Sequence, residues 1–147
     1  MIKIMNYQFK ILSEKNIDEI VDLVYKLNEN KIPKNILIKR QKEMFSQNYE
    51  CMGVFIKSKL IGVVGLWFQT RLYSGSSCEL DHVYILPKYR RFGVGSKFIS
   101  FIEEYVCNKG FECLELNTYS QNTLSHKFYY NSGFKILGFH FIKHIDI

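Results

Sequence analysis

A basic, glycine-rich turn between a strand pattern and a helix pattern constrains this chain more than any other feature. The turn, residues 90–95, follows the strand-like run 78–87 and precedes an amphipathic helix with no further glycine until Gly110. A turn that opens a helix exposes backbone N–H groups without a partner inside the helix, and the helix dipole adds partial positive charge there. The sequence therefore predicts a site for a phosphorylated ligand.

The residue types in the turn suit a pyrophosphate. Gly93 and Gly95 let the backbone approach a ligand closely. Arg90 and Arg91 add guanidinium donors suited to phosphate, and Ser96 adds a hydroxyl in the first helical turn. The spacing fits neither a P-loop nor the three-glycine dinucleotide fingerprint. A purely structural turn is the alternative, because glycine is common in tight turns.

Composition and charge narrow the class of protein. The 147 residues suffice for one core, and 47% of them are hydrophobic. The net charge of +6 suits an anionic ligand, but Lys and Arg are scattered rather than gathered in a stripe, which argues against nucleic acid. The four cysteines and four histidines follow no metal-binding spacing. We expect one cytoplasmic domain over residues 1–147 with no metal, and no membrane partner, because no apolar run approaches the roughly 18 residues of a span.

Hydrophobic periodicity predicts the order β-α-α-β-β-β-α-β-α-β. Asn16 begins a capping box before the first helix, and Pro33 opens the second. Hairpins dominate the first half and strand–helix–strand crossovers the second, which predicts a mixed α/β fold with helices on both faces of the sheet. The predicted strands are residues 7–12, 51–56, 60–68, 78–86, 111–116 and 134–145.

Two motifs resemble the GNAT superfamily of acyl-CoA N-acyltransferases. The turn matches that family's motif A, Arg/Gln-x-x-Gly-x-Gly/Ala, after a strand that ends near a proline. Residues 122–134 read Asn-x-x-Ser-x-x-Phe-Tyr-x-x-x-Gly-Phe and are similar to a second family pattern, with Ser125 in place of the usual alanine. The resemblance implies a GNAT fold with a mostly antiparallel sheet, acetyl-CoA as acyl donor and N-acetyltransferase activity.

The resemblance also implies how coenzyme A lies. The backbone at Val83 and Ile85 pairs with the pantetheine arm. Asn122 reaches the same arm and Phe128 packs near it, although a core role for Phe128 is equally open. The residues implied at the pyrophosphate are Arg90, Arg91, Phe92, Gly93, Val94, Gly95 and Ser96.

Two carboxylates precede the turn. Glu79 and Asp81 are two residues apart on the predicted strand, so we expect them to share a face with Val83 and Ile85. An ammonium has no lone pair, so a base must take its proton before acetyl transfer. Glu79 matches the family's general base and is the first candidate, and Asp81 is the second or positions the ammonium. Alternatively, one of them pairs with a basic neighbour such as Arg71.

The leaving thiolate needs a proton or a stabilising donor. Tyr129 stands where the family places such a tyrosine, and Tyr130 is the weaker candidate because it projects about 100° around the helix. Cys78 lies on the strand face opposite Glu79, which argues against a cysteine nucleophile.

The acceptor is less constrained. Trp67, Arg71 and Tyr73 are predicted to wall its site. Residues 115–143 also resemble aminoalkylphosphonate acetyltransferases, and a phosphonate would need cations such as Arg71, His140 or Lys143. A polyamine, an aminoglycoside or a protein amine is the alternative acceptor, and the family resemblance allows a homodimer.

Three functions stay open at this level. The first is a small-molecule N-acetyltransferase, the second a catalytically silent acyl-CoA-binding module, and the third a protein acetyltransferase. The pairing of Glu79 with Tyr129 favours an enzyme, because a sensor needs neither residue.

Overall fold

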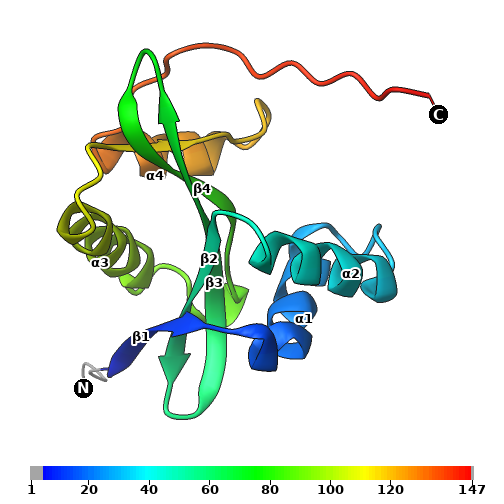
Figure 1. Cartoon of the computed structure of the whole chain (residues 1–147). Coiled ribbons are helices and arrows are strands. Elements are labelled where there is room, and N and C mark those ends of the chain that lie inside the picture. Colours follow the sequence, from blue (N-terminus) through cyan, green and yellow to red (C-terminus); the bar gives the residue numbers. More distant parts are fainter. Residues whose placement is uncertain (1–4, 147) are drawn as a thin grey trace. The chain divides into compact units, whose positions relative to one another are not determined.

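The computed structural model describes residues 5–146, which belong to two units, Met1–Leu116 and Asn117–Ile147 (Figure 1). The first unit contains β1 (Tyr7–Leu12), α1 (Ile17–Leu27), α2 (Lys34–Phe45), β2 (Tyr49–Ile56), β3 (Lys59–Arg71), β4 (Gly75–Ile85), α3 (Val94–Asn108) and β5 (Cys113–Leu116). The second unit contains α4 (Thr123–Asn131). Each unit is described by itself below.

The first unit is built on one mixed sheet with the strand order β1-β2-β3-β4-β5. Neighbours from β1 to β4 are antiparallel, and β5 runs parallel to β4. The helices α1 and α2 lie on one side of this sheet and α3 on the other (Figure 1). The predicted mixed, mostly antiparallel sheet with helices on both faces is therefore confirmed.

Apolar side chains fix which helix covers which face. Ile20 of α1 packs in one buried cluster with Tyr49 and Val63 of the sheet. On the other face, Phe98 of α3 is buried and its ring stacks on that of Phe9 with centroids 5.5 Å apart. Full burial of such a side chain contributes about 1.5–3 kcal/mol, so the apolar stripes decide how the helices dock.

The starts of α1 and α2 differ slightly from the predictions. The capping box is formed by Ser13 and Asn16, with Ser13 Oγ accepting from the Lys15 N–H at 3.3 Å and Asn16 Oδ1 accepting from the Ser13 N–H at 3.0 Å. It lies one turn earlier than predicted, because a short 3₁₀ turn precedes α1. Pro33 is the residue just before α2 rather than its first turn.

A β-bulge interrupts β4. The register of β4 against β3 shifts by one residue between Asp81 and Tyr84, and His82 there adopts a φ of 38°. Tyr84 consequently packs against the apolar cluster on the α1 side of the sheet. The extra residue reverses the alternation of side chains. The prediction that Val83 and Ile85 share the face of the carboxylates is therefore wrong.

The β3–β4 hairpin is longer than predicted. The strand β3 continues to Arg71, and β4 begins at Gly75, inside the predicted loop before residue 78. The two strands pair as far as Arg71 opposite Gly75. This extension places residues 67–71 directly across from the first half of β4.

The predicted last strand, at residues 134–145, is wrong. Residues 134–146 form neither a helix nor a strand within the described chain. A strand requires a neighbour whose backbone accepts and donates its hydrogen bonds, and apolar side chains alone do not supply one. The exposed large apolar side chains of this segment are Ile136, Leu137, Phe139, Phe141, Ile142 and Ile145.

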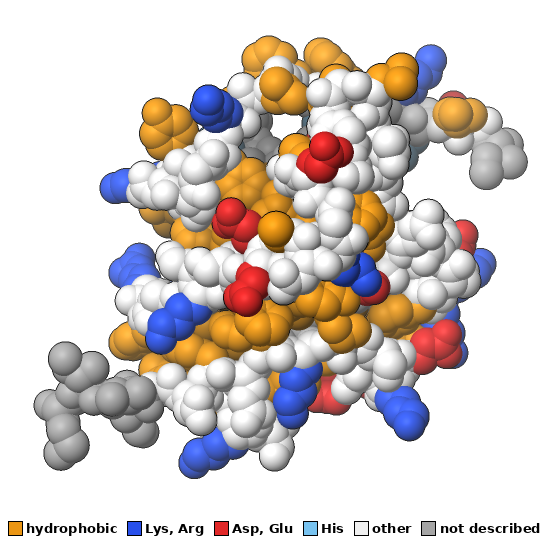
Figure 2. All heavy atoms as spheres, turned by 60° about the vertical axis from the view of Figure 1, so that its left-hand side comes forward, with side chains coloured by type: hydrophobic (Ala, Val, Ile, Leu, Met, Phe, Trp, Pro, Cys, Tyr) orange, Lys and Arg blue, Asp and Glu red, His pale blue; other side chains and the backbone are white. Residues whose placement is uncertain are grey.

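The surface carries both signs of charge. On the face shown in Figure 2, Lys and Arg side chains and Asp and Glu side chains are both scattered over the surface, and apolar side chains reach the surface between them. None of the described helices has the length and apolar character needed to cross a membrane.

Candidate active site

Glu79 and Asp81 of β4 lie opposite Trp67 and Gly65 of β3 in the strand register. Asp81 Oδ2 accepts a hydrogen bond from Trp67 Nε1 at 3.1 Å. Glu79 Oε2 accepts one from Gln69 Nε2 at 3.2 Å. The structure thus brings the two predicted carboxylates beside the aromatic stretch predicted to wall the acceptor site.

Arg71 lies between two carboxylates. Its Nη2 is 3.2 Å from Glu79 Oε2, and its Nε is 3.3 Å from Glu115 Oε2. The ion pair with Glu79 is the alternative that the sequence left open for this carboxylate. The guanidinium is shared by two acids, so its charge is already compensated before any acceptor binds.

Glu115 of β5 belongs to this site although the sequence did not suggest it. It is the register partner of Glu79, and its carboxylate accepts hydrogen bonds from Ser77 Oγ at 2.6 Å and from the Tyr73 hydroxyl at 2.7 Å. Burial acts to raise the pKa of this carboxyl, but the hydrogen bonds from Ser77 and Tyr73 and the charge of Arg71 outweigh it and lower the pKa. We call Glu79, Asp81 and Glu115 the carboxylate cluster.

The edge of β4 toward β5 is open beyond the cluster. Since β5 pairs with β4 only up to Leu80, no strand of residues 5–116 pairs with this edge at residues 81–85. The Arg90 side chain lies along β4, because its Nε donates to the Ile85 carbonyl oxygen at 2.7 Å. Both predicted phosphate-binding arginines are exposed, but the Arg90 guanidinium is engaged with the strand, whereas Arg91 lies at the turn.

The turn before α3 has the backbone of an anion site. Arg91 and Gly93 adopt left-handed φ angles of 70° and 77°, and Gly93 is the N-cap of α3. The Lys97 N–H bonds to the Gly93 carbonyl at 3.2 Å, so the N–H groups of residues 94–96 have no acceptor inside the helix. Exposed N–H groups at a helix start and in left-handed turns bind phosphate.

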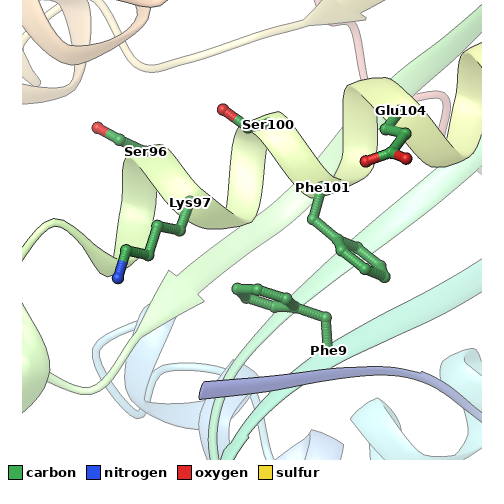
Figure 3. A pocket seen from close by; sticks show the side chains of 6 residues that line it. All are labelled: Phe9, Ser96, Lys97, Ser100, Phe101 and Glu104. Carbon is green, nitrogen blue, oxygen red and sulfur yellow. The ribbon is translucent and has the colours of Figure 1, made fainter. Parts of the chain in front are cut away.

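The other predicted residues of the turn differ in exposure. Phe92 is exposed, whereas Val94 is buried. Ser96 lines an open cavity of about 420 Å³ between β1 and α3, where the rings of Phe9 and Phe101 face each other (Figure 3). No member of the carboxylate cluster lines this cavity, so it is a separate hollow.

The second unit holds the remaining predicted residues. Asn122 caps α4, because its Oδ1 accepts from the Ser125 N–H at 3.3 Å. The rings of Phe128 and Tyr129 meet edge to face with centroids 5.2 Å apart, and burial raises the pKa of Tyr129 to about 12. A phenol with this pKa keeps its proton at neutral pH. Lys143 is exposed in the segment without regular structure.

Cys78 is not available as a nucleophile. It is fully buried, and burial raises the pKa of its thiol to about 12. The reactive form of cysteine is the thiolate, which is scarce at neutral pH for such a thiol.

The domain thus combines a mixed sheet, an open edge of β4 and, after this strand, a glycine turn whose N–H groups at the start of α3 have no acceptor inside the helix. The chain belongs to the acetyltransferase (GNAT) family, whose family model matches residues 17–134. The chain spans about half the length of the curated relatives it matches.

Two of these relatives acetylate amines, according to their names. An aminoalkylphosphonate N-acetyltransferase of Salmonella typhimurium is 29% identical over 86 residues, which are 58% of this chain and 56% of that protein. A spermidine N(1)-acetyltransferase of Thermoplasma acidophilum is 29% identical over 85 residues, which are 58% of this chain and 50% of that protein.

Solved structures confirm the predicted GNAT fold. An aminoglycoside N-acetyltransferase in complex with CoA has a TM-score of 0.83 at 15% identity, covering 100% of this chain and 99% of that chain. A possible acetyltransferase from Clostridium difficile 630 has a TM-score of 0.81 at 15% identity, covering 96% of this chain and 98% of that chain. Identities this low establish likeness of fold alone.

Proposed function

We propose that this chain is an N-acetyltransferase that moves the acetyl group of acetyl-CoA to a primary amine of a small molecule, with residues 1–147 as one catalytic domain. The observation that carries the proposal is the pair Glu79 and Asp81 beside an unpaired strand edge and an anion-binding turn. The pantetheine amides would bond to the backbone at residues 81–85. The N–H groups of the turn, with Arg91, would hold the pyrophosphate.

The residues divide the proton transfers between them. Glu79 takes a proton from the acceptor ammonium, directly or through water, and Asp81 holds the ammonium in place. Acetyl transfer then forms an amide and releases coenzyme A, and the departing sulfur takes a proton from a neighbouring donor. Tyr129 is the proposed donor, because its phenol is protonated at neutral pH. The second proton of the amine then restores the Tyr129 phenol, directly or through water. No covalent enzyme intermediate is required, in keeping with the buried thiol of Cys78.

A cationic acceptor suits the carboxylate cluster better than a phosphonate. The cluster brings three carboxylates together, and the guanidinium of Arg71 pairs with two of them, Glu79 and Glu115. A second ammonium on the acceptor is attracted by this charge, whereas a phosphonate is repelled. We therefore place di- and polyamines first, as in the name of the Thermoplasma relative. An aminoalkylphosphonate is second, because the Salmonella relative is equally identical.

A thiol-release assay with acetyl-CoA tests the proposal over spermidine, an aminoalkylphosphonate, an aminoglycoside and a peptide amine. We expect the fastest turnover with spermidine, and a fall in kcat of about 10²–10⁴-fold for Glu79→Gln. Thermal shift with acetyl-CoA controls for donor binding, since a ligand selective for the native state raises Tm. Binding of acetyl-CoA without thiol release for any amine would indicate a catalytically silent acyl-CoA-binding module. Thiol release with the peptide amine alone would indicate a protein acetyltransferase.

The homodimer also stays a proposal. Light scattering tests it, because a mass of 17.5 kDa corresponds to the monomer and twice that mass to the dimer.

A further inference from the structure

Four residues next to Glu79 form a closed ring of contacts. Asp81 Oδ1 accepts from the backbone N–H of His82 at 2.8 Å, and Asp81 Oδ2 accepts from Trp67 Nε1 at 3.1 Å. The Trp67 and Tyr49 ring centroids are 4.9 Å apart, and the Tyr49 hydroxyl is 2.6 Å from His82 Nε2. Both oxygens of Asp81 are therefore held by groups that are themselves joined through Tyr49.

A buried side chain of α2 anchors this ring. Gln41 is 4% exposed, and its Nε2 donates to the Tyr49 oxygen at 3.0 Å. Burial raises the pKa of Tyr49 and lowers the pKa of His82, so a neutral phenol and a neutral imidazole share this hydrogen bond at pH 7. Hydrogen bonds run from Gln41 through Tyr49 to His82 Nε2, and they favour one geometry because breaking either one leaves a buried polar group without a partner. His82 Nδ1 is buried and has no hydrogen-bond partner among the described residues, so the imidazole is held through Nε2.

The backbone is shaped around the imidazole. A φ of 38° is uncommon for a residue other than glycine, yet His82 adopts it in the bulge. Gly65 of β3 lies under the ring, where a Cβ would overlap His82 Nε2 and come within 2.7 Å of Tyr49 Cε2. The φ of His82 and the missing side chain of Gly65 are thus both required for the same contact between the His82 and Tyr49 side chains.

We propose that Tyr49 and His82 are positioning residues for the acceptor amine, acting through Asp81 and Trp67. This inference rests on the proposed function, in which Asp81 holds the ammonium while Glu79 takes its proton. The ring orients the Asp81 carboxylate and the indole beside it. Without the Tyr49 hydroxyl, Asp81 keeps its charge but loses its fixed direction, so amine binding weakens and donor binding does not change.

Tyr49→Phe tests the inference, since it keeps the aromatic ring and removes both hydrogen bonds of the hydroxyl. Tyr105→Phe is the matched control, because the Tyr105 hydroxyl also donates a short hydrogen bond, to Glu50 Oε2 at 2.6 Å. We expect Tyr49→Phe to raise KM for the amine about threefold to tenfold, the effect of one hydrogen bond, with kcat and acetyl-CoA affinity within twofold. Asp81→Asn should raise the same KM, and adding Tyr49→Phe to it should have little further effect. An unchanged KM for the amine overturns the inference.

A second measurement does not depend on activity. Trp67 is the single tryptophan of the chain, so its indole N–H gives one NMR signal. We expect Tyr49→Phe and Asp81→Asn to shift that signal and to speed its exchange with solvent at least threefold, and Tyr105→Phe to leave it unchanged. An unaltered indole signal in Tyr49→Phe overturns the inference. If the wild-type protein acetylates no amine, the proposed function fails, and the indole signal still decides whether Tyr49 holds Asp81.

Discussion

Replacing Gly65 with alanine is the sharpest test of the structure around His82. The new Cβ would overlap His82 Nε2, lie 2.7 Å from Tyr49 Cε2 and lie 2.9 Å from His82 Cδ2. Carbon atoms in contact prefer separations of about 3.5–4.0 Å, so one or both rings must move by about 1 Å. That movement breaks the 2.6 Å hydrogen bond between Tyr49 and His82.

The expected loss of stability has two parts. Overpacking a core by one methyl group costs about 1–3 kcal/mol, and leaving a buried polar partner unsatisfied costs about 1–3 kcal/mol. The lower entropy of alanine in the unfolded chain offsets about 0.4–1 kcal/mol of this. These ranges sum to a net loss of about 1–6 kcal/mol, and the midpoint of about 3 kcal/mol corresponds to a fall in Tm of about 6–12 °C for a chain of this length.

Thermal and urea unfolding measure the loss, with Gly138→Ala as the matched control. A Cβ at Gly138 would meet no atom within 4 Å, so we expect a change below about 1 kcal/mol there. The cycle of Gly65→Ala with His82→Ala identifies the cause, because the overlap with the imidazole disappears and only the contact with Tyr49 Cε2 remains. Gly65→Ala should therefore cost less in the His82→Ala background than in the wild type. The reasoning would be refuted if Gly65→Ala had the Tm of the wild type. It would also be refuted if the stability losses of Gly65→Ala and His82→Ala added up in the double variant.

Three further predictions concern His82, Gly93 and Glu115. Burial lowers the pKa of His82 below 6.5, although the charge of Asp81 opposes this, so the unfolded chain binds more protons than the native chain below that pH. The free energy of unfolding should therefore fall by up to about 1.4 kcal/mol per pH unit as the pH drops below 6.5. A His82→Gln variant with the same pH dependence of unfolding would contradict this. Gly93→Ala should lower the free energy of unfolding by about 1–2 kcal/mol, because the φ of Gly93 is 77°. It should also weaken acetyl-CoA binding in isothermal titration, and unchanged binding would show that the turn does not hold the donor. Glu115→Gln should lower kcat/KM for spermidine several-fold relative to kcat/KM for an aminoalkylphosphonate, since it removes one negative charge and a partner of Arg71. If a competition assay gives the same ratio of these two kcat/KM values as the wild type, the charge argument is contradicted.

Local patterns predicted those parts of the chain whose structure depends on neighbours in sequence. The first strand, residues 7–12, was predicted with its observed bounds, and the Gly93 turn forms the expected start of a helix. Both follow from short periodicities and from the backbone freedom of glycine, which adjacent residues reveal. The last predicted strand failed because its pairing partner cannot be read from its own alternation of side chains.

Two residues that the sequence did not place in the site, Glu115 and Tyr49, enter it through strand pairing. Glu115 stands beside Glu79 only because β5 lies parallel to β4 in that register. Tyr49 meets His82 only because β2 and β4 both flank β3 and because Gly65 leaves room between them. A sequence pattern describes one helix or strand at a time, whereas the contact between Tyr49 and His82 depends on three strands, β2, β3 and β4.

Contacts between strands also change which acceptor we expect. Arg71 taken alone is a free cation suited to a phosphonate, and the sequence supports that interpretation. In the folded chain its guanidinium bridges Glu79 and Glu115, and Asp81 adds a further carboxylate on the same face. The charge that an acceptor meets is a property of the whole cluster rather than of one residue. We therefore propose an acceptor with two ammonium groups, one to be acetylated and the other to remain charged beside the carboxylates.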